Sequence, residues 1–124
     1  MNEEIIKLWC IKADNDLKTG RDELSTGDPA TDTVCFHAQQ CVEKYLKAFL
    51  VFQGKEITKT HNIALLLQQC SSVDSSFEKL RTVGATALTV YAVDSRYPDD
   101  FYIPTRAESQ KEEVRQFVFG KIST

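Results

Sequence analysis

A long stripe of apolar residues at helical spacing constrains the fold of this chain more than any other sequence feature. It lies in TDTVCFHAQQCVEKYLKAFLVFQ, residues 31–53, which Gly54 follows. At about 100° per residue, one broad face of this segment collects most of its apolar side chains. They are Cys35, Ala38, Cys41, Val42, Tyr45, Leu46, Ala48, Phe49 and Phe52. The pattern predicts a central helix that Asp28 and Pro29 open, that Gly54 stops and whose apolar face belongs to the core.

The other segments also carry helical periodicity, and none reads convincingly as a strand. A first helix is expected from about Glu3 to Leu24, with Gly20 tolerated inside it. Its inward face is Ile5, Trp9, Ala13 and Leu17. A short third helix should follow Thr60 and run to about Gln69. The sequence therefore predicts an all-α fold.

Two pairs of residues with capping-box spacing place the remaining helices. Ser75 with Glu78 would open a fourth helix that ends before Pro98, and Thr105 with Glu108 would open a fifth that runs to about Lys121. In the fifth helix the inward residues are expected to be Val114, Phe117 and Val118. The sequence thus predicts five helices.

Composition favours one soluble domain over residues 1–124. The chain is 42 % hydrophobic and 27 % charged, and its apolar runs are far too short to span a membrane. The N-terminal MNEEIIK has acids where a signal peptide carries bases, so a cytoplasmic protein without membrane contact is expected. A net charge of −3 argues against a surface that coats nucleic acid, and any nucleotide contact must be local.

The four cysteines are expected to be buried, reduced thiols. Cys10, Cys35, Cys41 and Cys70 form no CxxC pair, and the chain offers two histidines as further ligands. Neither a metal site nor a cofactor is predicted.

A polar arc on the second helix allows two interpretations. It consists of Gln40, Glu43, Lys44 and Lys47, with Glu43 and Lys47 spaced for an ion pair. Such an arc is usually solvated. However, Phe36 lies within it and Leu50 at its edge, and apolar residues there suggest a partner surface. The candidate interface residues are Phe36, Gln39, Glu43 and Leu50.

Several segments together resemble the HEPN domain, named for higher eukaryotes and prokaryotes nucleotide-binding. They are WCIKADNDL (9–17), FHAQQCVEKYLKAFL (36–50), Gly54, THNIALLL (60–67) and SRYPDD (95–100). The resemblance covers nearly the whole chain. It implies an up-and-down helical bundle that forms a homodimer, often encoded beside a minimal nucleotidyltransferase as a toxin and antitoxin pair.

The resemblance also raises ribonuclease activity as a function to test. Several branches of the family cleave RNA without metal, through an arginine and a histidine that are separated by four to six residues. Imidazole moves a proton there while guanidinium stabilises charge on the phosphate. After Arg96 that window holds Phe101, Tyr102 and Ile103, and no histidine follows His61. The expectation is therefore a non-catalytic binding module, with a degenerate ribonuclease or a structural dimerisation module as alternatives.

The candidate ligand-binding residues are Gln40, Lys44, Lys47, His61, Arg96 and Tyr97. In this interpretation the cations bind a phosphate and Tyr97 stacks on a base. Each has a structural interpretation as well. Arg96 suits the C-terminal end of a helix before Pro98, and His61 suits the first turn of the third helix. His37 is expected to face solvent.

Overall fold

The computed structural model describes residues 3–82 and 102–122. Over these ranges it contains five α-helices and one 3-10 turn, and no strand, so the predicted all-α fold is confirmed. The elements are α1 (Glu3–Leu24), α2 (Thr31–Phe52), α3 (Ile63–Val73), η1 (Ser75–Phe77), α4 (Glu78–Thr82) and α6 (Tyr102–Ile122). No helix in the described ranges combines the length and apolar character that crossing a membrane requires.

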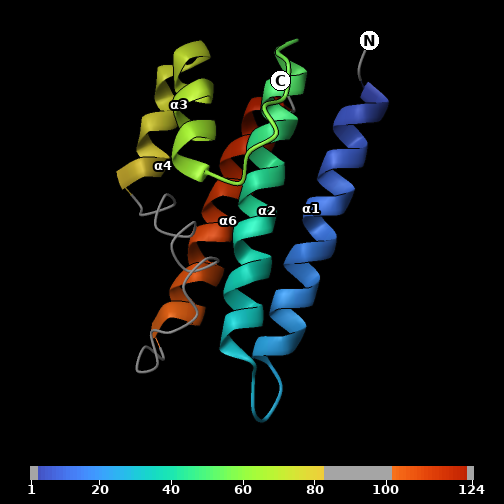
Figure 1. Cartoon of the computed structure of the whole chain (residues 1–124), viewed down its shortest axis with the longest axis vertical. Coiled ribbons are helices and arrows are strands. Elements are labelled where there is room, and N and C mark those ends of the chain that lie inside the picture. Colours follow the sequence, from blue (N-terminus) through green and yellow to red (C-terminus); the bar gives the residue numbers. More distant parts are fainter. Residues whose placement is uncertain (1–2, 83–101, 123–124) are drawn as a thin grey trace.

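The long helices α1, α2 and α6 lie side by side, with the shorter α3 and α4 beside one half of α2 and α6 (Figure 1). Helix α1 runs antiparallel to α2, while α6 runs in the same direction as α2. Because α2 contacts α1, α3 and α6, it is the centre of the bundle, as its apolar stripe predicted.

The core lies along that stripe of α2, except that Phe52 is 39 % exposed; on α1, the predicted inward residue Ile5 is 48 % exposed and lies outside the core. Tyr45, Leu46 and Phe49 are at most 1 % exposed. The ring of Phe77 lies 4.3 Å from that of Phe49 and 4.9 Å from that of Phe117, joining η1 and α6 to α2. Burial of such rings is the main favourable contribution to folding.

The predicted start of the second helix was two residues early. Helix α2 begins at Thr31, and its N-cap is Ala30, whose side chain cannot cap; instead the Glu23 carboxylate accepts a hydrogen bond from the Ala30 amide at 2.9 Å. Its predicted end is confirmed. The Lys55 amide donates to Leu50 O and the Gly54 amide to Val51 O, with Gly54 at φ +74°. This is a Schellman cap, which needs the left-handed conformation that glycine adopts without strain.

The three other predicted caps were misplaced. Helix α3 begins at Ile63 because its N-cap is Asn62 rather than Thr60. The Asn62 side chain accepts a hydrogen bond from the Leu65 amide. Asp74, rather than Ser75, caps η1 through Ser76 N.

Helix α6 begins at Tyr102, so Thr105 and Glu108 lie inside the helix rather than at its cap. The predicted continuation of the fourth helix to Pro98 falls outside the described residues.

Gly20 allows α1 to approach α2 and α6 closely. A Cβ at this position would lie 3.2 Å from Glu108 Oε2 and 3.5 Å from Val34 O. Nearby, the fully buried Lys111 donates from Nζ to Leu17 O at 3.1 Å and pairs with Glu108. The glycine thus makes room for a carboxylate that neutralises a buried ammonium group.

The four cysteines are free thiols; Cys35, Cys41 and Cys70 are buried, as predicted, whereas Cys10 is only half-buried. Burial raises the pKa of Cys35 to about 11 and that of Cys70 to about 12. In the described ranges no group of three or more His, Cys, Asp and Glu residues is arranged to hold a metal ion.

Candidate functional site

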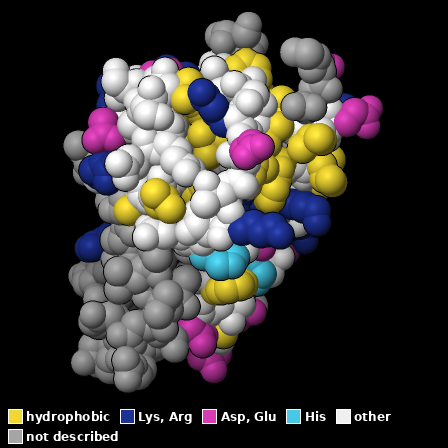
Figure 2. Space-filling model, turned by 45° about the horizontal axis from the view of Figure 1, so that its top comes forward, with side chains coloured by type: hydrophobic (Ala, Val, Ile, Leu, Met, Phe, Trp, Pro, Cys, Tyr) yellow, Lys and Arg dark blue, Asp and Glu magenta, His cyan; other side chains and the backbone are white. Residues whose placement is uncertain are grey.

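Two carboxylates, one on α2 and one on α1, each bridge a histidine and a lysine. We call Gln39, Glu43, Lys47 and His61 the Glu43 cluster, and Asp16, His37 and Lys44 the Asp16 cluster. Helix α2 supplies residues to both clusters. Helix α1 supplies Asp16, and the connection before α3 supplies His61. Figure 2 shows the face on which Lys and Arg side chains lie next to the histidines.

The Glu43 cluster is closed. Glu43 Oε1 accepts from His61 Nδ1 at 2.9 Å and from Gln39 Nε2 at 3.0 Å, and Oε2 accepts from Lys47 Nζ at 3.0 Å. Gln39 also donates to His61 O at 3.2 Å, which fixes the connection on α2. Glu43 is 2 % exposed and Lys47 6 %. With three donors on one carboxylate, the buried charges are paired and satisfied.

The Asp16 cluster is more open. Asp16 Oδ1 accepts from His37 Nδ1 at 2.8 Å, and Oδ2 forms an ion pair with Lys44 Nζ. Side-chain exposure is 11 % for Asp16, 23 % for His37 and 21 % for Lys44. The lysine and the histidine are therefore about twice as exposed as the carboxylate.

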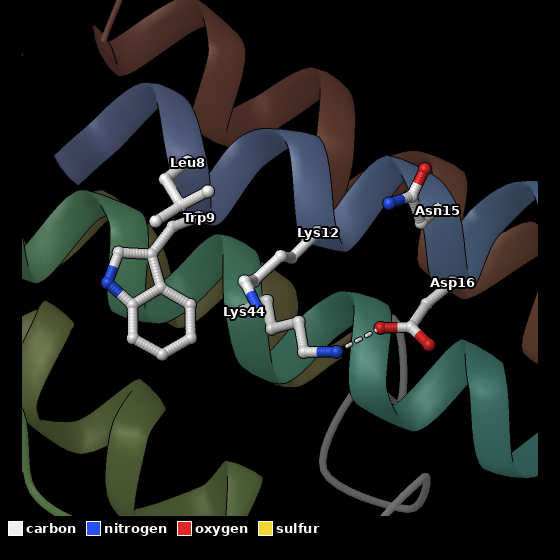
Figure 3. Close-up of a pocket in the computed structure, with 6 residues that line it drawn as sticks. All are labelled: Leu8, Trp9, Lys12, Asn15, Asp16 and Lys44. Atoms are coloured by element: carbon white, nitrogen blue, oxygen red, sulfur yellow. Dashed lines mark hydrogen bonds and ion pairs between the residues drawn. The ribbon is translucent and has the colours of Figure 1, made fainter. Parts of the chain in front are cut away.

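A cavity of about 530 Å³ lies between α1 and α2 beside the Asp16 cluster. Leu8, Trp9, Lys12, Asn15, Asp16 and Lys44 line it. Figure 3 shows the Trp9 ring at one end and the Asp16 carboxylate with Lys44 toward the other. The exposed Lys12 has no ion pair among the described residues. A cavity of this size with an aromatic ring and two ammonium groups suits a small anionic ligand that carries a ring.

The solvated-arc interpretation was wrong for Glu43 and Lys47, although their predicted ion pair is confirmed. Both are buried because His61 and helix α1 cover this part of the arc; Lys47 Nζ lies 5.7 Å from the centre of the Trp9 ring. Lys47 is therefore no free cation for a ligand. Gln40 is half-buried and donates to Gln39 Oε1 at 2.8 Å.

The two histidines also differ from expectation. His37 does not face solvent freely, because it bonds Asp16 and its ring lies edge-on to Phe36, with centroids 5.3 Å apart. His61 precedes the first turn of α3 rather than lying in it. Its side chain is nevertheless 80 % exposed, so only the Nδ1 edge is held, by Glu43.

The candidate interface residues differ sharply in exposure within their own chain. Phe36 is 45 % exposed, whereas Gln39, Glu43 and Leu50 are at most 2 % exposed. Phe36 is thus the one of the four that a partner could contact without rearrangement. Arg96 and Tyr97 lie outside the described residues.

Sequence reasoning missed Asp16, Trp9 and Lys12 as site residues. A signal for Asp16 was present, since it falls between Ala13 and Gly20 at the helical spacing of the face that contacts α2. Trp9 was placed in the core, yet its ring also lines the cavity. No local pattern distinguishes Lys12 from other exposed lysines.

Comparison with known proteins decides the family. The sequence profile of the HEPN domain matches residues 6–119. The chain belongs to the HEPN family. A crystal structure of an archaeal HEPN homologue is 28 % identical to it, with a TM-score of 0.73 over 94 % of this chain and 97 % of that chain. No curated protein matches the chain. The HEPN resemblance of the sequence is therefore confirmed, and with it the helical bundle.

Proposed function

We propose that this HEPN protein is a non-catalytic module that binds a nucleotide in the cavity between α1 and α2. The observation that carries the proposal is the lining of that cavity, with Trp9 at one end and Lys12 and Lys44 as cations. An indole ring stacks on a base, and ammonium groups bind a phosphate. The volume of about 530 Å³ falls within the usual range of small-molecule sites.

The sequence supports the non-catalytic part of the proposal. Arg96 lacks the downstream histidine that the ribonuclease branches of the family use, and tyrosine or phenylalanine in that window cannot exchange protons near neutrality. A ribonuclease with an unusual site is the alternative. It is favoured by the two carboxylate-oriented imidazoles, His37 and His61, because such an imidazole can act as a general base.

Titration calorimetry with ATP, AMP and a short RNA tests the binding proposal. Two ligand-contacting cations and one ring should give dissociation constants on the order of 10⁻⁴ to 10⁻⁶ M at low salt, weakening as salt rises. Trp9→Ala and Lys12→Ala should each weaken binding about fivefold or more. Lys7→Ala, an exposed lysine on α1 that does not line the cavity, is the matched control and should bind like the parent.

The result that would overturn the proposal is absence of binding at low salt, or equal affinity for the parent, Trp9→Ala and Lys12→Ala. Cleavage of the RNA by the parent during the titration would instead favour the ribonuclease alternative, provided that His37→Ala or His61→Ala abolishes the cleavage.

The oligomeric state and the protein partner are further parts of the proposal. The module is proposed to form a homodimer that buries Phe36, and to work with a minimal nucleotidyltransferase. Support for the dimer is the 45 % exposure of Phe36, since an aromatic ring on a polar face favours burial. Sedimentation would contradict the dimer if the parent and Phe36→Asp were both monomers at micromolar concentration.

A further inference from the structure

We propose that Asp16 competes with the ligand for Lys44, so that binding exchanges the carboxylate for a ligand phosphate. This inference rests on the proposed nucleotide site and identifies the residue that limits its affinity. In the ligand-free protein Asp16 holds Lys44 through Oδ2 and His37 through Oδ1. Asp16 and Lys44 both line the cavity, so an anion in it meets their ion pair directly (Figure 3).

The charge of the cavity lining shows why this competition matters. Lys12 and Lys44 face one aspartate, which leaves one net positive charge among the six lining residues. Lys12 is exposed and has no ion-pair partner among the described residues, whereas Lys44 is already neutralised. A phosphate therefore meets one available ammonium group and a repelling carboxylate, and gains the second ammonium group only if Lys44 leaves Asp16.

His37 makes that exchange less costly. An ionised carboxylate is an acceptor only, so the Nδ1 that contacts Asp16 at 2.8 Å must carry a proton. When Lys44 turns to a phosphate, Asp16 keeps this donor and is not left without a partner. The flexible lysine stem, with a side chain already 21 % exposed, can swing toward the cavity while the 11 % exposed carboxylate stays in place.

Lys47 cannot act in the same way, although its cluster has the same chemical groups. Its carboxylate partner accepts two further hydrogen bonds and is 2 % exposed. Moving Lys47 away from Glu43 would leave a buried charge without its counter-ion, which would strongly destabilise the protein. The exchange is therefore specific to Asp16 and Lys44.

Calorimetry with AMP and adenosine on Asp16→Asn tests the inference. The amide keeps the size of the side chain and one acceptor oxygen but removes the charge, so AMP should bind about five- to tenfold more tightly than to the parent. Adenosine, which lacks the phosphate, should show no such gain. In the Asp16→Asn background, Lys44→Met should cancel the gain.

The outcomes separate this inference from the proposed function. If Asp16→Asn binds AMP no better than the parent while Trp9→Ala and Lys12→Ala still weaken binding, the competition is refuted and the nucleotide site stands. If neither the parent nor Asp16→Asn binds AMP, both the nucleotide site and the competition are refuted. Asp16→Ala replaces Asp16→Asn should the latter not fold.

A measurement on the parent protein avoids any dependence on variants. The ¹³C resonance of the Asp16 carboxyl should move when AMP is added and stay in place with adenosine, because only the phosphate takes Lys44 away. A carboxyl resonance that AMP leaves unchanged at saturation would also overturn the exchange.

Discussion

The Glu43 and Asp16 clusters contain the same three groups, a carboxylate between an imidazole and an ammonium, yet they differ in what surrounds them. Glu43 has a further donor in Gln39 and a lysine partner that is 6 % exposed. Asp16 has no further hydrogen bond among the described residues, and its lysine lines a cavity. The chemical identity of the groups alone therefore does not make a binding site. Burial and the number of donors decide whether a charge is held permanently or can be exchanged.

The largest expected effect on the free energy of unfolding comes from removing the carboxylate charge of the Glu43 cluster. Glu43→Gln removes the counter-ion of the buried Lys47 and should destabilise the fold by about 3–5 kcal/mol. Urea unfolding would measure it. Glu78→Gln, at an exposed carboxylate that pairs with Arg81 and accepts a hydrogen bond from Ser71 Oγ, is the control and should move the midpoint far less.

A companion variant sharpens that prediction. Adding Lys47→Met to Glu43→Gln removes the unpaired ammonium and should recover part of the lost stability, because an apolar chain of similar volume tolerates burial. If Glu43→Gln is as stable as Glu78→Gln, the Glu43 cluster does not hold the connection to α2 and the comparison fails.

The equivalent change in the open cluster should cost less. Asp16→Asn should destabilise the fold by about 1 kcal/mol, because Lys44 can turn to water and the amide oxygen still accepts a hydrogen bond. The same urea experiment applies, with the Glu43→Gln value as the reference. A loss for Asp16→Asn equal to that for Glu43→Gln would mean that both clusters are structural and that Asp16 is not exchangeable.

Much of the helical architecture could be predicted from periodicity. The apolar spacing of residues 35–52 identified α2 and its core face, and the bounds of α1 agreed with the structure. Caps were less predictable, because several residues compete for the same amides. Thr60 and Asn62 both have suitable side chains, and the geometry of the connection gives the helix amide to Asn62.

The site was harder to predict because its partners come from distant parts of the chain. The arc on α2 showed which polar residues share a face, but not that His61 and α1 cover it. Burial of Glu43 and Lys47 depends on this cover, and so does the pairing of Lys44 with Asp16. Periodicity within one helix carries no information about what packs against it.

A titration of AMP followed through the ¹⁵Nζ and ¹³Cε resonances of the lysine side chains would show which lysines contact the phosphate. The titration compares the resonances of Lys44, which lines the cavity beside Asp16, with those of Lys47, which is held by Glu43. The resonances of Lys44 and Lys12 should shift with AMP concentration by much more than those of Lys47, whose Nζ lies 5.7 Å from the centre of the Trp9 ring, while those of Lys7 should stay in place. Equal shifts for Lys44 and Lys47, or a shift of Lys47 alone, would contradict the exchange at Asp16.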